Sequence, residues 1–255
     1  QSDVLVNLVV PRYVERGSSA TFKCTHNVRP EILFKVTWLK VDKGKFFEFI
    51  NGRNPPFRNS TIEGAEIDWD NSNEQQVTLK DVQFDLSGQF YCEVSTDTPI
   101  FTKASADELM SVFLPQTGPP TIKFRKRTPF AVGEKLFALC NTTRGRPAPH
   151  ITWLINGKKV EDRYVRTHHQ EKGMFSISQL NIELTEEHVG SNSRMEITCL
   201  STIPATVGQG EQYADYKTYS VKVEVERQLA SSTSTASPSI GMAALGNGNG
   251  HGNET

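Results

Sequence analysis

Short runs of alternating hydrophobic and polar residues recur along the chain, separated by turn residues about every 8 to 12 positions. Such runs, rich in β-branched and aromatic residues, predict half-buried β-strands, and no long stretch shows the 3.6-residue repeat of an amphipathic helix. The first half therefore predicts an all-β core, whose inward-facing sets are Ala20, Phe22 and Cys24; Phe34, Val36 and Trp38; Val77 and Leu79; and Phe90 and Cys92.

The same pattern returns in the second half, which predicts a duplicated architecture. Its inward-facing sets are Leu136, Ala138 and Cys140; Ile151, Trp153 and Ile155; Leu180, Ile182 and Leu184; and Met195, Ile197 and Cys199. Between the copies, the segment 114–120 holds three prolines, which fix φ and lack an amide donor. We expect a short, stiff connector there, with domains at 1–117 and 118–227.

Residues 228–255 have a different composition, dominated by Ser, Thr, Ala, Gly and Asn. A segment with so few large apolar groups cannot offset the entropy of ordering. We expect a disordered tail, or simply a ragged chain end.

The cysteines and tryptophans share one spacing in both halves. Trp38 follows Cys24 by 14 residues and Trp153 follows Cys140 by 13, with Cys92 and Cys199 further on. This arrangement resembles tandem immunoglobulin domains, in which a disulfide between strands B and F packs against a tryptophan on strand C. The resemblance implies disulfides Cys24–Cys92 and Cys140–Cys199. A zinc site is disfavoured because no two cysteines have short ligand spacing.

Details of the two domains predict different sandwich types. In domain 1, the run 45–50 followed by Asn51-Gly52 predicts the C' strand and turn of a variable-like domain. In domain 2, Asn156-Gly157 predicts a type I' turn in a constant-like or intermediate domain. The tyrosine usual two residues before the second cysteine is replaced by Phe90 and Ile197, so neither domain has a tyrosine corner.

Composition excludes several classes of protein. The chain has 255 residues, with 28 Lys or Arg and 29 Asp or Glu. This balance gives no general field for nucleic acid, and no apolar run is long enough to span a membrane. With neither a catalytic motif nor metal-ligand spacing, we expect no enzyme, no cofactor and no metal site, and we interpret His168 and His169 as loop residues.

The implied disulfides require an oxidising compartment. Acceptor motifs for N-linked glycans occur at Asn59, Asn141 and Asn253, and alternation predicts that Asn141 faces outward. No basic-then-apolar leader opens the chain, so we expect that any signal peptide has been removed. We expect an extracellular protein, either secreted or attached to the outer face of the plasma membrane.

Several segments of residues 1–227 resemble the beaten path (Beat) family of neuronal immunoglobulin-superfamily proteins. They are Val9-Val10-Pro11, FKVTWLK with Phe46-Phe47, the run 91–102 (YCEVSTDTPIFT), and LTEEH at 184–188 ahead of Ile197-Thr-Cys199. The resemblance implies a secreted or membrane-anchored protein that binds Sidestep-family receptors in axon guidance and synaptic partner choice.

Candidate contact residues follow from strand alternation. Because Trp38 and Cys92 point into the core, their neighbours Thr37, Leu39, Tyr91 and Glu93 should lie on the outer face of the GFCC' sheet. Variable-like domains commonly bind partners through this face, where aromatic residues are frequent anchors. The alternative is that Leu39 and Tyr91 are merely exposed or pack locally, without contacting a partner.

Two further segments are candidates for partner contact. Alternation puts Phe47 and Phe49 on one face of the C' strand and Phe46 on the other, without deciding which face is inward; we take Phe47 and Phe49 as contact residues. Ile100 and Phe101 follow a proline-stiffened F–G turn, which lowers the ordering cost of binding. The alternative is a loop folded back on its own domain.

The charge distribution leaves two alternative functions open. Residues 119–165 hold ten Lys or Arg against three Asp or Glu, and could bind a sulfated glycan. Alternation argues against one shared face for all of them, which favours a solvated set of strand and loop charges. These residues are Lys123, Arg125, Lys126, Arg127, Arg144, Arg146, Lys158 and Lys159. A homophilic adhesion molecule, forming a weak homodimer through the GFCC' face, is the other alternative.

Overall fold

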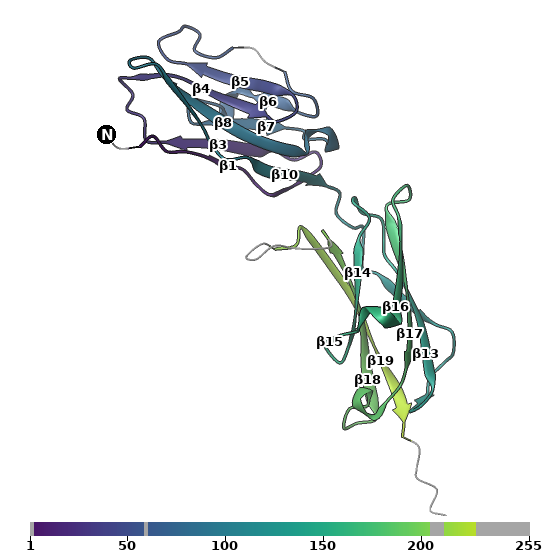
Figure 1. The fold of residues 1–255 in the computed structure, drawn as a ribbon. Helices are drawn as coiled ribbons and strands as arrows, with labels where there is room; N and C mark the ends of the chain where they lie inside the picture. Colours follow the sequence, from purple (N-terminus) through teal and green to yellow (C-terminus); the bar gives the residue numbers. More distant parts are fainter. Residues whose placement is uncertain (1–2, 59–60, 205–211, 228–255) are drawn as a thin grey trace, which may run out of the picture.

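A computed structural model describes residues 3–58, 61–204 and 212–227 of the chain. These residues form two β-sandwiches that lie end to end (Figure 1). The expected all-β fold with two tandem immunoglobulin-like sandwiches is confirmed.

Domain 1 packs two sheets face to face. One sheet has the strand order β1-β3-β7-β6, formed by β1 (Val6–Val9), β3 (Ala20–His26), β7 (Gln76–Lys80) and β6 (Glu66–Asp68). The other has the order β2-β10-β8-β4-β5, formed by β2 (Tyr13–Glu15), β10 (Glu108–Phe113), β8 (Gly88–Thr96), β4 (Leu33–Lys40) and β5 (Gly44–Ile50), with β9 (Phe101–Ala104) also paired to β8. Short 3-10 helices are η1 (Trp69–Asn71) and η2 (Phe84–Leu86).

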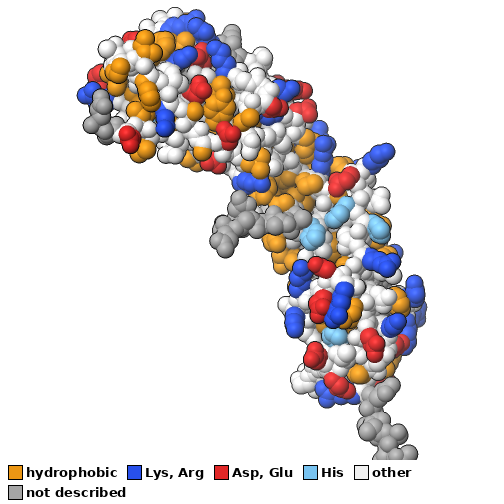
Figure 2. Space-filling view, viewed as in Figure 1, with side chains coloured by type: hydrophobic (Ala, Val, Ile, Leu, Met, Phe, Trp, Pro, Cys, Tyr) orange, Lys and Arg blue, Asp and Glu red, His pale blue; other side chains and the backbone are white. Residues whose placement is uncertain are grey.

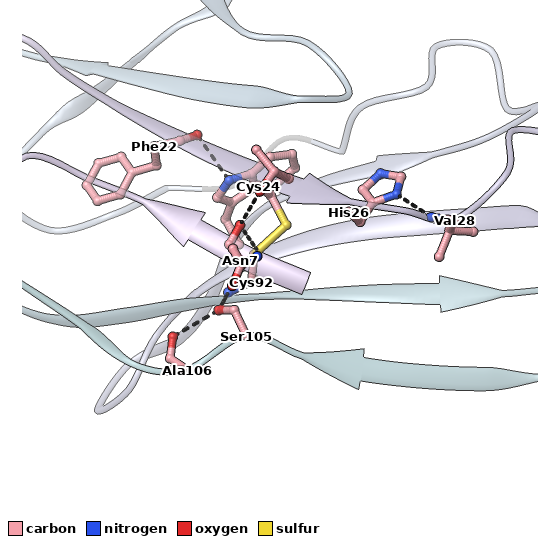
Figure 3. Close-up of a disulfide and its surroundings, with 10 residues drawn as sticks. Asn7, Phe22, Cys24, His26, Val28, Cys92, Ser105 and Ala106 are labelled. Carbon is pink, nitrogen blue, oxygen red and sulfur yellow. Dashed lines mark hydrogen bonds between the residues drawn. A yellow bond between two sulfur atoms is a disulfide. The ribbon is translucent and has the colours of Figure 1, made fainter. Parts of the chain in front are cut away.

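The disulfide of domain 1 joins the two sheets as expected. Cys24 on β3 is bonded to Cys92 on β8, and the buried Trp38 donates its indole N–H to the carbonyl oxygen of Phe22 at 3.2 Å. Ser105 closes the other side, since its Oγ accepts the Cys92 amide at 3.0 Å (Figure 3). Phe90 is fully buried 4.9 Å from Phe22, which confirms that a core phenylalanine replaces the corner tyrosine.

Domain 2 repeats this plan. One sheet has the order β11-β13-β17-β16, formed by β11 (Thr121–Phe124), β13 (Lys135–Asn141), β17 (Phe175–Glu183) and β16 (Val165–Gln170). The other has the order β12-β19-β18-β14-β15, formed by β12 (Phe130–Ala131), β19 (Asp215–Glu226), β18 (Arg194–Ile203), β14 (His150–Ile155) and β15 (Lys158–Lys159). The 3-10 helices are η3 (Asp162–Tyr164) and η4 (Glu186–His188).

The core of domain 2 also follows the sequence pattern. Cys140 on β13 is bonded to Cys199 on β18, and the indole N–H of Trp153 donates to Ser178 Oγ at 2.9 Å. The predicted turn joins β14 to β15, with Asn156 at φ 51° and Gly157 at φ 80°, as a type I' turn requires. Both predicted disulfides are therefore confirmed, and domain 2 has a short C' strand.

A network of polar contacts holds the two domains together. Gln116 is buried, its side chain donates to Asp215 Oδ2 at 3.1 Å, and its side-chain oxygen accepts from Ser201. Leu114 and Arg146 exchange two backbone hydrogen bonds of 2.9 and 3.0 Å. Hydrophobic side chains gather around this joint (Figure 2), where Phe113 of domain 1 and Pro147 of domain 2 line one pocket.

Candidate functional site

The outer face of the sheet containing β4, β5 and β8 carries the candidate contact residues. Tyr91 and Leu39 stand opposite each other on β8 and β4, and Lys45 on β5 is the next partner of Leu39. In the neighbouring row, Glu93 on β8, Thr37 on β4 and Glu48 on β5 are register partners. Tyr91, Leu39 and Glu93 are half-buried, so alternation correctly placed these three side chains on an accessible face.

Two exposed residues extend the apolar part of this face. Leu109 on β10 is the register partner of Gln89 and is 42% exposed. The Val41 amide donates to the Gln89 carbonyl at 2.9 Å, and Val41 is 49% exposed. Together Leu39, Val41, Tyr91 and Leu109 form what we call the apolar strip, which crosses β4, β8 and β10 and includes Val41 just after the end of β4.

A buried carboxylate lies beside the apolar strip. The Glu48 side chain is 3% exposed, and cationic nitrogens of Lys35, Lys45 and Arg58 lie 3.3, 3.6 and 3.7 Å from its oxygens. Thr37 donates its hydroxyl to Glu48 Oε1 at 3.3 Å. Glu48 Oε2 has no hydrogen-bond partner within the described part of the chain. The three cations therefore form a positively charged rim around one fixed negative charge.

The protonation of Glu48 follows from this arrangement. Burial alone would raise the pKa of the carboxyl group, but a hydrogen bond from Lys35 and the charges of Lys35, Lys45 and Arg58 outweigh it. The net effect lowers the pKa of Glu48, so the carboxylate is ionised at neutral pH.

The predicted contacts on β5 are wrong. A β-bulge between Trp38 and Leu39 adds one residue to β5, so Phe46 and Phe47 both enter the core and Phe47 is 0% exposed. Phe49 pairs with the buried Val36 and lies on the core side, 5.7 Å from the ring of Phe57. Neither residue lies on the outer face.

Two other expectations need correction. Thr37 is on the outer side but only 4% exposed, since it is covered beneath the Glu48 cluster. Phe34, expected in the core, is 41% exposed because a second irregularity between Leu33 and Lys35 interrupts alternation on β4.

The F–G hairpin presents its apolar residues to solvent. Ile100 is 89% exposed and Phe101, at the start of β9, is 45% exposed. The Thr96 hydroxyl donates to the carbonyl oxygen of Pro99, which closes the turn. The described hairpin therefore leaves both predicted residues accessible.

Sequence reasoning missed three residues of the face. Val41 follows Leu39 by two positions, so continued alternation would have found it. Glu48 alternates with Phe47 and Phe49, which would have placed it outward once the inner face of β5 was known. Leu109 gave no such signal, because its place depends on how β10 pairs with β8.

Several other sequence predictions concern residues outside this face of domain 1. Asn59, Asn253 and the segment 228–255 lie outside the described residues, and Asn141 is half-buried on β13. His168 and His169 lie on β16 and not in a loop.

Within residues 3–58, 61–204 and 212–227, no group of three or more His, Cys, Asp or Glu could hold a metal ion. The same ranges contain no helix long and apolar enough to cross a membrane.

Comparison with known proteins gives a family match for domain 2. Residues 120–209 match the CD80-like C2-set immunoglobulin domain. A segment of 82 residues is 32% identical to basal cell adhesion molecule of Rattus norvegicus, covering 32% of this chain and 13% of that protein. A segment of 140 residues is 29% identical to muscle M-line assembly protein unc-89 of Caenorhabditis elegans, covering 50% of this chain and 2% of that protein. The chain thus spans only a small part of these relatives.

Two solved structures align with most of the chain at low identity. Rst D1-D2 aligns with a TM-score of 0.43 at 17% identity, covering 89% of this chain and 100% of that chain. A marsupial T cell receptor aligns with a TM-score of 0.37 at 12% identity, covering 86% and 95% of the two chains. The family match and the two disulfide-linked sandwiches show that domain 2 contains a C2-set immunoglobulin domain within an immunoglobulin-like chain.

Proposed function

We propose that this chain is an extracellular recognition protein whose domain 1 binds a Sidestep-family immunoglobulin-superfamily receptor in axon guidance or synaptic partner choice. The partner class comes from the Beat-like residues of the sequence, and a role in recognition agrees with the similarity to an adhesion molecule. The observation that carries the proposed site is the apolar strip, which stands on the accessible face of a rigid sheet.

The chemistry of the face defines what a partner must offer. Tyr91 and Leu39 supply half-buried apolar surface on two paired strands, so little side-chain freedom is lost on binding. The rim of Lys35, Lys45 and Arg58 favours a partner with acidic groups around an apolar centre. The proposed mechanism is reversible docking without covalent chemistry.

A multivalent binding screen tests this proposal. The ectodomain is displayed against each Sidestep-family ectodomain, with itself and heparin as parallel baits. A Sidestep-family hit that is lost in Leu39→Asp or Tyr91→Asp, both still folded by circular dichroism, supports the proposal. The matched control is Val9→Asp, since Val9 is 56% exposed on β1 in the opposite sheet.

Other outcomes decide against parts of the proposal. Retention only by the chain itself would favour the homophilic alternative through the same face. Retention only by heparin would remove the receptor assignment. Full receptor binding by folded Leu39→Asp and Tyr91→Asp variants would show that another surface makes the contact.

A further inference from the structure

The outer face of one sheet in domain 2 gathers basic residues that are far apart in the sequence. Lys123 on β11 is the register partner of Leu139 on β13, Leu139 of Gln179 on β17, and Gln179 of Arg166 on β16. All four side chains are exposed, and this sheet is seen in Figure 1 as the layer of β13, β17 and β16. One row across four strands thus has a cation at each end.

A second row supplies another cation and an aromatic floor. The Arg125 amide donates to the Phe137 carbonyl at 3.3 Å, and its guanidinium carbon lies 4.5 Å from the centre of the Phe137 ring. Phe137 is the register partner of Asn181, which is exposed. The guanidinium lies over the face of the ring, where the cation–π attraction favours keeping it on this side of the sheet.

The cations of these rows differ from two other basic residues of domain 2, Lys126 and Arg163, in having no acidic partner within the described residues. Lys126 is paired with Glu134 at 2.5 Å and Arg163 with Glu161 at 2.8 Å. No such ion pair within 4.0 Å is found for Lys123, Arg125 or Arg166 among the residues that the structure describes. Their positive charge is therefore available to an external anion.

The surface between the cations is suited to a carbohydrate. Phe137 and Leu139 line a shallow hollow with Lys123, Arg125 and Gln179. Apolar side chains can pack against the faces of sugar rings, the amides of Gln179 and Asn181 can bond hydroxyl groups, and guanidinium and ammonium groups can bind sulfate or carboxylate. Lys123 and Arg166 are separated by three strand spacings, or roughly 14 Å, which accommodates a short run of sugars.

We propose that this face of domain 2, formed by Lys123, Arg125, Arg166, Phe137 and Gln179, binds a sulfated glycan chain. The site does not depend on the proposed receptor contact, which lies on domain 1. Of the eight basic residues considered from the sequence, two contribute. Arg146 lies at the domain joint, and Lys158 and Lys159 lie on β15 in the opposite sheet. Arg166 joins the site through strand pairing that sequence spacing does not reveal.

Surface plasmon resonance on immobilised heparin tests the proposal. The ectodomain is first treated with an endoglycosidase, so that any carbohydrate on the neighbouring Asn141 is removed. Saturable binding at 0.15 M NaCl is expected, and K123Q/R125Q/R166Q should weaken it roughly tenfold. K158Q/K159Q/K222Q removes the same charge from the opposite sheet and should retain most of the affinity.

Several results would overturn the proposal: no saturable binding, equal affinity of the first triple variant and the wild type, or equal losses in both triple variants. Equal binding to desulfated heparin would also contradict it, as would stronger binding to phosphatidylserine vesicles than to heparin. Should the first triple variant not fold, K123Q alone is expected to weaken binding two- to threefold. Unchanged affinity in that variant would count against the site. The triple variant should still bind the Sidestep-family receptor. Loss of heparin binding with receptor binding kept would separate the glycan site on domain 2 from the proposed function of domain 1.

Discussion

Leu39 and Tyr91 are directly opposed on neighbouring antiparallel strands, with Leu39 on β4 and Tyr91 on β8. Leu39 follows Trp38 and Tyr91 precedes Cys92. Trp38 and Cys92 are core residues and are themselves register partners in the adjacent position. The same strand pairing that holds the disulfide and its tryptophan therefore fixes the centre of the candidate interaction face.

Truncation of Tyr91 should weaken receptor binding more than it affects folding. Tyr91→Ala removes half-buried aromatic surface, and a central aromatic contact typically contributes at least about 2 kcal/mol to an interface. We expect about a thirtyfold or larger increase in the Kd for a Sidestep-family ectodomain. Titration by surface plasmon resonance measures this change.

A comparison within the apolar strip checks that prediction. Leu109→Ala, farther along the same face, should cost less because Leu109 lies toward the sheet edge on β10. An unchanged Kd for Tyr91→Ala together with a large loss for Leu109→Ala would move the centre of the interface toward β10.

Glu48 should make domain 1 sensitive to acid. Its pKa is lowered in the folded state, so its stabilising contribution is fully present above the pKa of the unfolded chain. That contribution is lost as the pH falls through the lower pKa of the folded state. Glu48→Gln should therefore destabilise domain 1 by about 1 to 2 kcal/mol at pH 7 and have less effect as the medium becomes strongly acidic.

Urea unfolding at a series of pH values measures the effect of Glu48. Glu63→Gln is the matched control, because Glu63 forms an exposed pair with Lys43 at 3.6 Å. An exposed pair of this kind contributes little. A pH-independent loss of stability in Glu48→Gln would show that packing, and not its charge, is responsible.

The disulfides should stabilise the two domains separately. Replacing Cys24 and Cys92 together by Ala opens a loop spanning 68 residues and should cost domain 1 about 2 to 5 kcal/mol. The core of domain 2 has its own disulfide and its own buried cluster. Amide hydrogen exchange should show lost protection in β3 and β8 with retained protection in β13 and β18. Equal loss in both domains would indicate a single cooperative unit.

Most of the fold could be predicted from sequence because its signals are local. Alternation identified the inward positions around Cys92 and Cys140, and it placed Leu39 and Tyr91 outward. It failed at Phe34 and Phe46, where irregular pairing shifts the register by one residue, and it did not decide that the face shared by Phe47 and Phe49 is the inward one. A bulge depends on how two strands fit together, and neither strand shows it alone.

The surfaces could be predicted only in part for a related reason. The basic face of domain 2 joins Lys123 with Arg166, 43 positions along the chain, through three strand pairings. The Glu48 cluster likewise brings Arg58 from the segment after β5 to a carboxylate on that strand. Charge counts along the sequence detect the excess of basic residues but do not distinguish paired cations from available ones.

Arg146 should control how firmly the two domains are oriented. Its guanidinium carbon lies 3.9 Å from the centre of the Phe84 ring, so a domain 2 side chain stacks on a domain 1 aromatic residue. Such a contact contributes about 0.5 to 2 kcal/mol. Arg146→Ala keeps the two backbone bonds with Leu114 but removes this contact, so the joint should bend over a wider range.

Small-angle X-ray scattering of Arg146→Ala should show a broader distribution of interdomain distances at an unchanged melting temperature for each domain. Arg144→Ala is the control, since Arg144 is an exposed residue two positions away.

If domain 1 binds a receptor while domain 2 binds a surface glycan, a fixed joint raises the effective concentration of the second contact after the first. Arg146→Ala should then weaken binding to a surface carrying both ligands but leave binding to either ligand alone unchanged. Equal loss on the single-ligand surfaces would instead place Arg146 within a binding site.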